Sequence, residues 1–198
     1  MNDQRFNFFY LYKFKFYFNS MNSFKIVLTG AESSGKTTLA TQLARHFKGT
    51  LVLEYARSFF EQKKTTSYVY EDLLKIAKGQ IRLEHKKIKT HFESKLCILD
   101  TDLLTIKIWS MVKFGKCDDW ILKQIETGSY DLYFLCSPEG IAWKADPLRE
   151  NPQDRNNLFE LYQKELIFYD KKFVVLKGNE IERLQIAATI LKNNFGID

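Results

Sequence analysis

The apolar residues of the chain fall into short unbroken runs that alternate with longer stretches of helical periodicity. Continuous apolar runs, rather than alternating ones, are typical of strands that helices cover on both faces. The pattern therefore predicts an α/β fold, in which a five-stranded, mainly parallel sheet lies between two layers of helices. The predicted strands are Phe24–Thr29, Leu51–Leu53, Leu96–Leu99, Leu132–Cys136 and Phe173–Leu176.

Helical periodicity occupies most of the sequence between these runs. The stretch from Tyr70 to Phe92 places apolar residues on one face and many lysines and glutamates on the other, so its charges are those of a solvated helix surface. Because Lys86, Lys87 and Lys89 belong to this face, they do not predict binding to nucleic acid. Further helices are predicted after Thr37 and over Leu103–Phe114, Asp119–Glu126, about Asn156–Tyr169 and about Glu180–Asn194.

Residues 1–21 differ from the rest of the chain. The run from Arg5 to Phe18 is rich in aromatic residues, but it is shorter than the roughly 20 apolar residues of a membrane span, and lysines interrupt it. It also lacks the cleavage site of a signal peptide. We interpret residues 1–21 as an extension, disordered or preceding a native start at Met21. Residues 22–198 contain no repeat or linker and form one predicted domain.

Composition narrows the class of protein only slightly. A chain of 198 residues with 45% hydrophobic and 27% charged residues has the make-up of one globular domain. Its net charge of +6 suits a phosphate-bearing small molecule as well as nucleic acid. The odd number of cysteines and the absence of a C-x-x-C pair predict a reducing, cytoplasmic setting. Cys97 and Cys136 lie in apolar runs and are expected to be inert core residues.

A glycine-rich loop follows the first predicted strand and precedes a helix. It has the complete pattern G-x-x-x-x-G-K-[ST], in the context that a phosphate-binding loop requires, which makes a chance glycine turn a poor alternative. In such a loop, backbone N–H groups surround the β-phosphate, the lysine reaches the β- and γ-phosphates, and the Thr37 hydroxyl holds Mg²⁺. The predicted nucleotide-binding residues are Gly30, Ala31, Glu32, Ser33, Ser34, Gly35, Lys36, Thr37 and Thr38.

Carboxylates follow the second and third predicted strands. Asp100 ends the third strand, where an aspartate orders Mg²⁺ in P-loop enzymes, and Asp102 would assist it or contact the substrate. The alternative for Asp102 is an N-cap of the helix that begins at Leu103. Glu54 ends the second strand and is the candidate base that accepts the proton of an attacking hydroxyl. An N-cap or a salt bridge is an equally good interpretation of this glutamate.

The remaining motifs favour a small phosphotransferase over other P-loop proteins. The sequence lacks the N-K-x-D and D-x-x-G motifs of signalling GTPases. The segment Ser137–Arg155 contains all the prolines and precedes a helix, which suits a mobile lid. Arg149 and Arg155 would then neutralise phosphate charge, unless they only pair with neighbouring acidic residues on the surface.

Together these motifs resemble the nicotinamide riboside kinase domain of NadR-type proteins, within the wider NadR/Ttd14-like set of AAA-type P-loop domains. The resemblance runs from about Phe24 to the C-terminus. It rests on GAESSGKTTLA, EYAR, EDLLKIAKGQ, DTDLLTIKIWS, YDLYFLCSPEGIAWKADPLREN and the arginine-bearing last helix.

The resemblance implies ATP- and Mg²⁺-dependent phosphorylation of the ribose 5′-hydroxyl of nicotinamide riboside. It places Glu54, Tyr55 and Arg57 at the riboside, Asp100 and Asp102 at metal and substrate, and Arg149 and Arg155 on the lid. Trp143 would stack on the cationic pyridinium ring, although an exposed loop residue or an apolar anchor is an equal alternative. The family often has a proline where this chain has Ala142.

The resemblance also sets limits and leaves alternatives. His46, His85 and His91 form no H-x-G-H motif of an adenylyltransferase, so a separate adenylyltransferase is expected to complete NAD. One alternative is another nucleoside or nucleotide kinase. Another is a nucleotide-dependent binding module that regulates a partner or a lipid surface with little chemistry.

Overall fold

The five predicted strands form one sheet in the computed structural model, which describes residues 23–146 and 153–197. The strand order is β2-β3-β1-β4-β5, and every neighbouring pair is parallel. The predicted fold class is therefore confirmed, with the second strand one residue earlier and the third one residue longer than expected. The strands are β1 (Phe24–Thr29), β2 (Thr50–Val52), β3 (Leu96–Asp100), β4 (Leu132–Cys136) and β5 (Phe173–Leu176).

The helices follow the predicted order with one addition. Helix α2 follows shortly after β2, in a stretch for which the sequence pattern predicted no helix. This helix is short, and the side chain of its N-cap residue, Glu54, makes no capping hydrogen bond, so the usual start signal is missing. The helices are α1 (Lys36–His46), α2 (Tyr55–Lys63), α3 (Tyr70–Thr90), α4 (Leu103–Phe114), α5 (Asp119–Thr127), α6 (Arg155–Phe168) and α7 (Glu180–Phe195).

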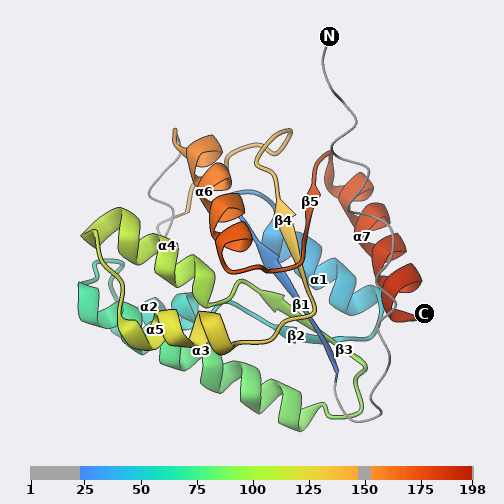
Figure 1. The fold of residues 1–198 in the computed structure, drawn as a ribbon, viewed down its shortest axis with the longest axis horizontal. Coiled ribbons are helices and arrows are strands. Elements are labelled where there is room, and N and C mark those ends of the chain that lie inside the picture. Colours follow the sequence, from blue (N-terminus) through green and yellow to red (C-terminus); the bar gives the residue numbers. More distant parts are fainter. Residues whose placement is uncertain (1–22, 147–152, 198) are drawn as a thin grey trace.

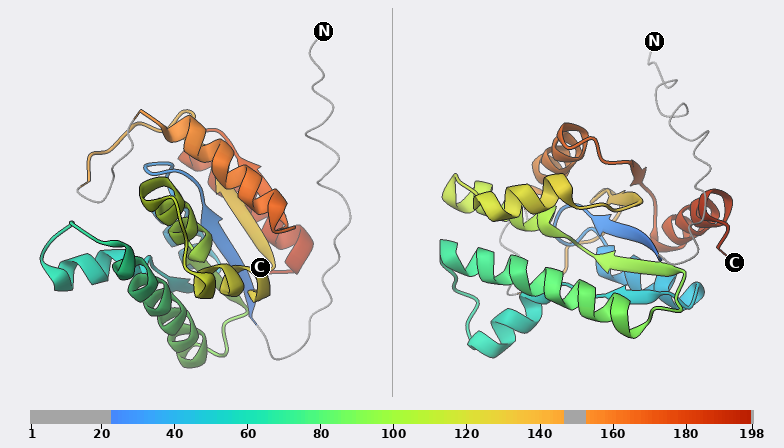
Figure 2. Two further views of the ribbon diagram at one scale, coloured as in Figure 1. Left: turned by 60° about the vertical axis from the view of Figure 1, so that its left-hand side comes forward. Right: turned by 60° about the horizontal axis from the view of Figure 1, so that its bottom comes forward.

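Helices cover both faces of the sheet, which gives the three layers seen in Figures 1 and 2. Successive side chains of a strand point to opposite faces. Ile26 and Leu28 of β1 accordingly pack with α1 and α7, whereas Val27 packs with the cluster that contains α2 to α6. Both faces are apolar for this reason, and Cys97 and Cys136 are buried within them as free thiols, as predicted.

The chain reverses direction across the sheet at β1. After β1 it builds β2 and β3 on one side, and then β4 and β5 on the other. Loops that leave the carboxyl ends of the strands diverge at such a point and form the ligand-binding crevice of open α/β sheets. The glycine-rich loop after β1 lies there. Among the described residues, no helix combines the length and apolar character needed to cross a bilayer; residues 1–22 lie outside them.

Helices α2 and α3 touch at a glycine. A Cβ atom built on Gly79 of α3 would lie 2.0 Å from the ring of Tyr55, the first residue of α2. The hydrogen of glycine therefore lets the aromatic ring lie directly on the α3 backbone. Glycine costs helical stability, so its presence inside α3 reflects this close packing.

We predict that Gly79→Ala destabilises the protein, although alanine is the better helix former. The added methyl group displaces the Tyr55 ring, and overpacking of this kind costs about 1–3 kcal/mol. Urea unfolding of wild type and variant measures the change. The same substitution in a Tyr55→Ala background should be neutral or stabilising, and equal destabilisation in both backgrounds would refute the packing argument.

Candidate functional site

The glycine-rich loop wraps around the N-terminus of α1. Gly30 has a φ of 131°, and a Cβ atom on it would lie 2.6 Å from the carbonyl oxygen of Cys136 in β4. Only glycine fits there, because β4 and the loop are in contact. Lys36 Nζ donates hydrogen bonds to the carbonyl oxygens of Gly30, at 2.9 Å, and Ala31, at 2.7 Å, so the lysine lies back across its own loop.

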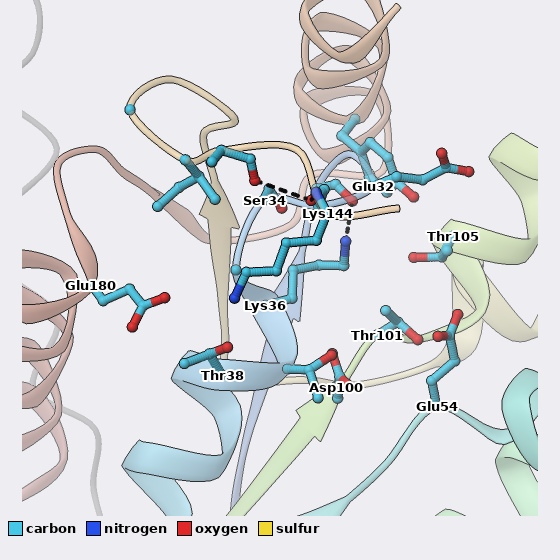
Figure 3. Close-up of a pocket in the computed structure, with 18 of the residues that line it drawn as sticks. Glu32, Ser34, Lys36, Thr38, Glu54, Asp100, Thr101, Thr105, Lys144 and Glu180 are labelled. Atoms are coloured by element: carbon cyan, nitrogen blue, oxygen red, sulfur yellow. Dashed lines mark hydrogen bonds between the residues drawn. The ribbon is translucent and has the colours of Figure 1, made fainter. Parts of the chain in front are cut away.

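A pocket of about 300 Å³ opens above this loop. It extends from the start of α7, past the loop, to the ends of β2 and β3 and the facing sides of α4 and α6 (Figure 3). Its size lies at the lower end of the range for small-molecule sites. The predicted site residues that line it are Gly30, Glu32, Ser33, Ser34, Gly35, Lys36, Thr37, Thr38, Glu54, Arg57 and Asp100. Ala31 is buried behind the loop.

The end of β3 carries a buried carboxylate beside a hydroxyl, a pair of groups that could contribute to holding Mg²⁺. Asp100 is buried, and its Oδ1 atom has no hydrogen-bond partner among the described residues. The Thr37 hydroxyl bonds to the same side chain, while burial raises the pKa of Asp100. An orphaned carboxylate oxygen beside a hydroxyl provides two oxygen ligands of the kind that Mg²⁺ prefers, together with waters and phosphates. Within the described ranges, no three His, Cys, Asp or Glu side chains lie together as a metal-binding cluster. Waters and nucleotide phosphates would therefore have to supply the other ligands of a bound Mg²⁺.

The Gln80 side chain fixes the backbone on both sides of Glu54. The Gln80 side chain accepts a hydrogen bond from the Tyr55 amide at 2.7 Å and donates one to the Leu53 carbonyl at 3.3 Å. Burial and the nearby Asp100 raise the pKa of Glu54 to about 7. A carboxyl group with a pKa in this range is suited to accept a proton at neutral pH.

Arg57 and Asp146 join the two rims of the pocket. Arg57 Nη1 donates to Asp146 Oδ2 at 3.0 Å, and its Nε lies 3.8 Å from Glu54 Oε2. This arginine extends from α2, whereas Asp146 lies at the end of the described part of the loop that follows β4. Residues 137–146, which we call the strap, therefore end on the side of the pocket where Glu54 lies.

Three predicted substrate-binding residues do not line the pocket. Asp102 Oδ1 accepts from the Leu104 amide at 3.2 Å, and its Oδ2 accepts from the Tyr133 hydroxyl at 2.8 Å. The N-cap alternative describes its position, because both oxygens are used inside the fold. Tyr55 turns toward α3 and packs on Gly79. Trp143 is half-buried on the strap, outside the pocket lining.

The two predicted lid arginines have different outcomes. Arg155 begins α6, and its guanidinium donates to the carbonyl oxygens of Pro138 and Ile141 at 2.6 to 3.0 Å. It therefore anchors the strap rather than facing the pocket, which corrects the expectation that it contacts phosphate. Arg149 lies outside the described residues.

Sequence reasoning missed several residues of the pocket. Thr105 and Trp109 are one helical turn apart on α4, so they share the face that meets Tyr162 of α6 at the pocket. The position of Thr105 and Trp109 shortly after Asp100, on one face of the predicted helix, was the available signal for these two residues. No sequence signal links Tyr162 to them, because α6 reaches the pocket only through the tertiary fold. Lys144 of the strap and Asn179 and Glu180 at the start of α7 complete the other side.

Arg183 is the arginine of the last helix, and its role was not predicted: its side chain connects three loops around the pocket. It is 2% exposed, and its guanidinium donates to the carbonyl oxygens of Ser34 at 2.8 Å, Ser137 at 2.8 Å, Glu139 at 3.0 Å and Gly178 at 2.7 Å. Burial lowers its pKa. Four carbonyl acceptors offset the cost of burying the charge. Arg183 thereby fixes the glycine-rich loop, the strap and the start of α7 relative to one another.

These features define a P-loop protein with the fold of nucleoside and nucleotide kinases. A family model described as an AAA domain matches residues 25–183, and the chain belongs to this family. Solved structures with the same fold include a thymidylate kinase from Candida albicans, with a TM-score of 0.67 and 15% identity over 89% of this chain and 94% of that one. A deoxyadenosine kinase from M. mycoides gives 0.59 and 16%, over 85% and 99%.

The chain is also similar to NadR. It is 29% identical over 127 residues to the trifunctional NAD biosynthesis/regulator protein NadR of Escherichia coli K12, which covers 63% of this chain and 30% of that protein. The chain thus spans less than a third of the curated relatives that it matches. A crystal structure of NadR in complex with NR has a TM-score of 0.72 and 19% identity, over 89% of this chain and 52% of that one.

The raised pKa of Glu54 predicts a pH-dependent cost to folding. Its native pKa of about 7 exceeds the ordinary value of 4.5, so the ligand-free protein loses stability as pH rises between these values. At pH 8, Glu54→Gln should therefore melt at least about 2–4 °C above wild type, the shift that about 1 kcal/mol gives a domain of this size. At pH 5 the difference should be much smaller, because Glu54 is then protonated in the folded protein and only partly protonated in the unfolded chain.

Thermal unfolding at both pH values measures this difference. Glu61→Gln is the matched control, because Glu61 is an exposed glutamate on the same helix as Tyr55 and Arg57. An advantage of Glu54→Gln that is the same at pH 5 and pH 8 would contradict the assignment.

Proposed function

We propose that the protein transfers the γ-phosphoryl group of ATP to the 5′-hydroxyl of nicotinamide riboside and forms nicotinamide mononucleotide. The observation that carries this proposal is one pocket that runs along a phosphate-binding loop and has a carboxyl group of pKa about 7 near one end. The likeness to NadR, and to a NadR structure that contains NR, supports the choice of acceptor. The product would serve an adenylyltransferase that completes NAD.

The donor half of the pocket accounts for nucleotide binding. The loop amides and Lys36 would surround the phosphates, and Thr37 and Asp100 would hold Mg²⁺. Bound Mg²⁺ neutralises phosphate charge during transfer. Lys36 is partly buried, and burial lowers its pKa, while Asp100 and Glu54 oppose the decrease. A lysine that is partly shielded from bulk solvent interacts more strongly with the developing charge.

Glu54 is the proposed base. It lies across the pocket from the loop, and its pKa of about 7 lets it accept the hydroxyl proton at neutral pH and release it afterward. Figure 3 shows Glu54 with Thr101 and Thr105 on the side of the pocket away from Glu180. An acceptor hydroxyl bound on this side would lie between the γ-phosphate and Glu54, as an in-line transfer requires.

The acceptor side has aromatic and acidic character. Trp109 and Tyr162 line it, and Glu32 extends toward the same side as Thr105 and Glu54 (Figure 3). Aromatic faces and carboxylates together favour a flat cation. The pyridinium ring of nicotinamide riboside is such a group, whereas the bases of common nucleosides are neutral. We therefore assign ring recognition to Trp109 and Tyr162 in place of Trp143.

A different nucleoside or nucleotide kinase is the second candidate. The thymidylate kinase likeness favours it, because that fold match extends over 94% of the compared chain. An acceptor panel separates the candidates: ATP and Mg²⁺ are supplied with nicotinamide riboside, adenosine, cytidine, thymidine, thymidylate or no acceptor, and products are identified by mass. Phosphorylation of nicotinamide riboside alone is the expected result. Preference for another acceptor supports the second candidate, and ATP binding without any product indicates a nucleotide-dependent binding module.

Within this assay, Lys36→Ala should lower turnover on the order of a hundredfold or more, by analogy with removing one donor to the transition state. Lys123→Ala, an exposed lysine on α5, is the control and should leave turnover unchanged. Wild-type turnover in Lys36→Ala would refute the site.

Ring recognition predicts a charge-dependent effect at Trp109. Trp109→Leu should raise the KM for nicotinamide riboside on the order of tenfold, since a desolvated cation–π contact contributes about 2 kcal/mol. The neutral dihydropyridine form of the riboside should change much less, and the KM for ATP should stay within about twofold. Trp120→Leu, a half-buried tryptophan outside the pocket lining, is the matched control. Equal loss for charged and neutral ribosides would refute the assignment.

A further inference from the structure

The described pocket lining contains three cationic side chains: Lys36, Arg57 and Lys144. Lys36 belongs to the phosphate-binding loop, and Arg57 is paired with Asp146 at the acceptor side. Arg155, expected to contact phosphate, donates to strap carbonyl oxygens. Lys144 is therefore the cation of the strap that faces the nucleotide half of the pocket.

The backbone of Lys144 is fixed directly to the phosphate-binding loop. Its amide donates to Ser33 Oγ at 2.9 Å, and the same hydroxyl donates to the Ala142 carbonyl oxygen at 3.4 Å. Ser33 is buried and has a φ of 54°, in the left-handed region. One serine thus holds two strap residues against the loop that binds phosphate.

The Lys144 side chain leaves this attachment point and enters the pocket. Figure 3 shows it extending past Lys36 toward the side where Thr38 and Glu180 lie. The other end of the strap is held by Arg183 and Arg155, so its position relative to the loop is determined at several points. The backbone from which the exposed Lys144 side chain extends is therefore in place before any ligand binds, so ordering this backbone adds no entropy cost to binding.

We propose that Lys144 contacts the triphosphate of bound ATP and acts with Lys36 as a second cationic catalytic residue. The proposal rests on the donor half of the proposed function and is independent of the acceptor. Phosphoryl transfer spreads negative charge over the phosphate oxygens, and cations on two sides stabilise it better than one. Lys144 would thus have the role that the sequence suggested for Arg155, from a different position on the same segment.

Nucleotide affinities test the contact without any turnover. Lys144→Met keeps the length of the side chain and the Ser33 hydrogen bond but removes the charge. It should weaken ATP binding on the order of tenfold, as expected for loss of a charge-assisted contact, and change AMP binding by less than about twofold. Lys144→Arg should retain most of the ATP affinity, and Lys123→Met is the control for a lost surface charge.

The outcomes separate this proposal from the proposed function. A selective loss of ATP over AMP affinity, restored by arginine, supports the phosphate contact even if nicotinamide riboside is not an acceptor. Unchanged ATP affinity, or equal loss for ATP and AMP, overturns it even if nicotinamide riboside is phosphorylated. Where an acceptor is phosphorylated, kcat should also fall on the order of tenfold in Lys144→Met and recover in Lys144→Arg.

Discussion

The buried guanidinium of Arg183 is the interaction on which the geometry of the pocket depends. It donates to carbonyl oxygens of the phosphate-binding loop, the strap and Gly178 in the turn before α7, three segments far apart in sequence. A buried charge is costly unless each donor is satisfied, so these loops stabilise Arg183 as much as it orders them. Because its acceptors are backbone carbonyl oxygens, these hydrogen bonds depend on the backbone conformation of the loops and not on the identity of their side chains.

For the proposed function, order in these loops matters because phosphoryl transfer depends mainly on placement and charge. The loop amides must already point inward when nucleotide arrives, and reorganising them would cost catalytic free energy. Arg183 holds Ser34 from one side, while Ser33 holds the strap on the other. The donor half is therefore preorganised by hydrogen bonds that a ligand need not form.

The side of the pocket proposed to bind the acceptor is positioned by helix packing and by one glutamine. Glu54 is placed by Gln80, which satisfies backbone groups on each side of it, and by the packing of α2 on α3 through Gly79. The Arg57–Asp146 pair then links this half to the end of the strap. Because the raised pKa of Glu54 comes mainly from burial, its chemistry is a property of the packed helices rather than of the glutamate alone.

The sequence by itself determined the parallel sheet, the phosphate-binding loop and the acidic end of β3, because apolar runs and glycine motifs act over a few neighbouring residues. For Asp102 it left two roles open, of which the N-cap describes the structure, and it misjudged Arg155, which anchors the strap. It marked Arg183 only as the arginine of the last helix, without its contacts to three loops, and it did not predict that Trp109 and Tyr162 line one pocket. These depend on contacts between segments distant along the chain, and only the tertiary structure decides which buried polar groups face one another and which remain free for a ligand.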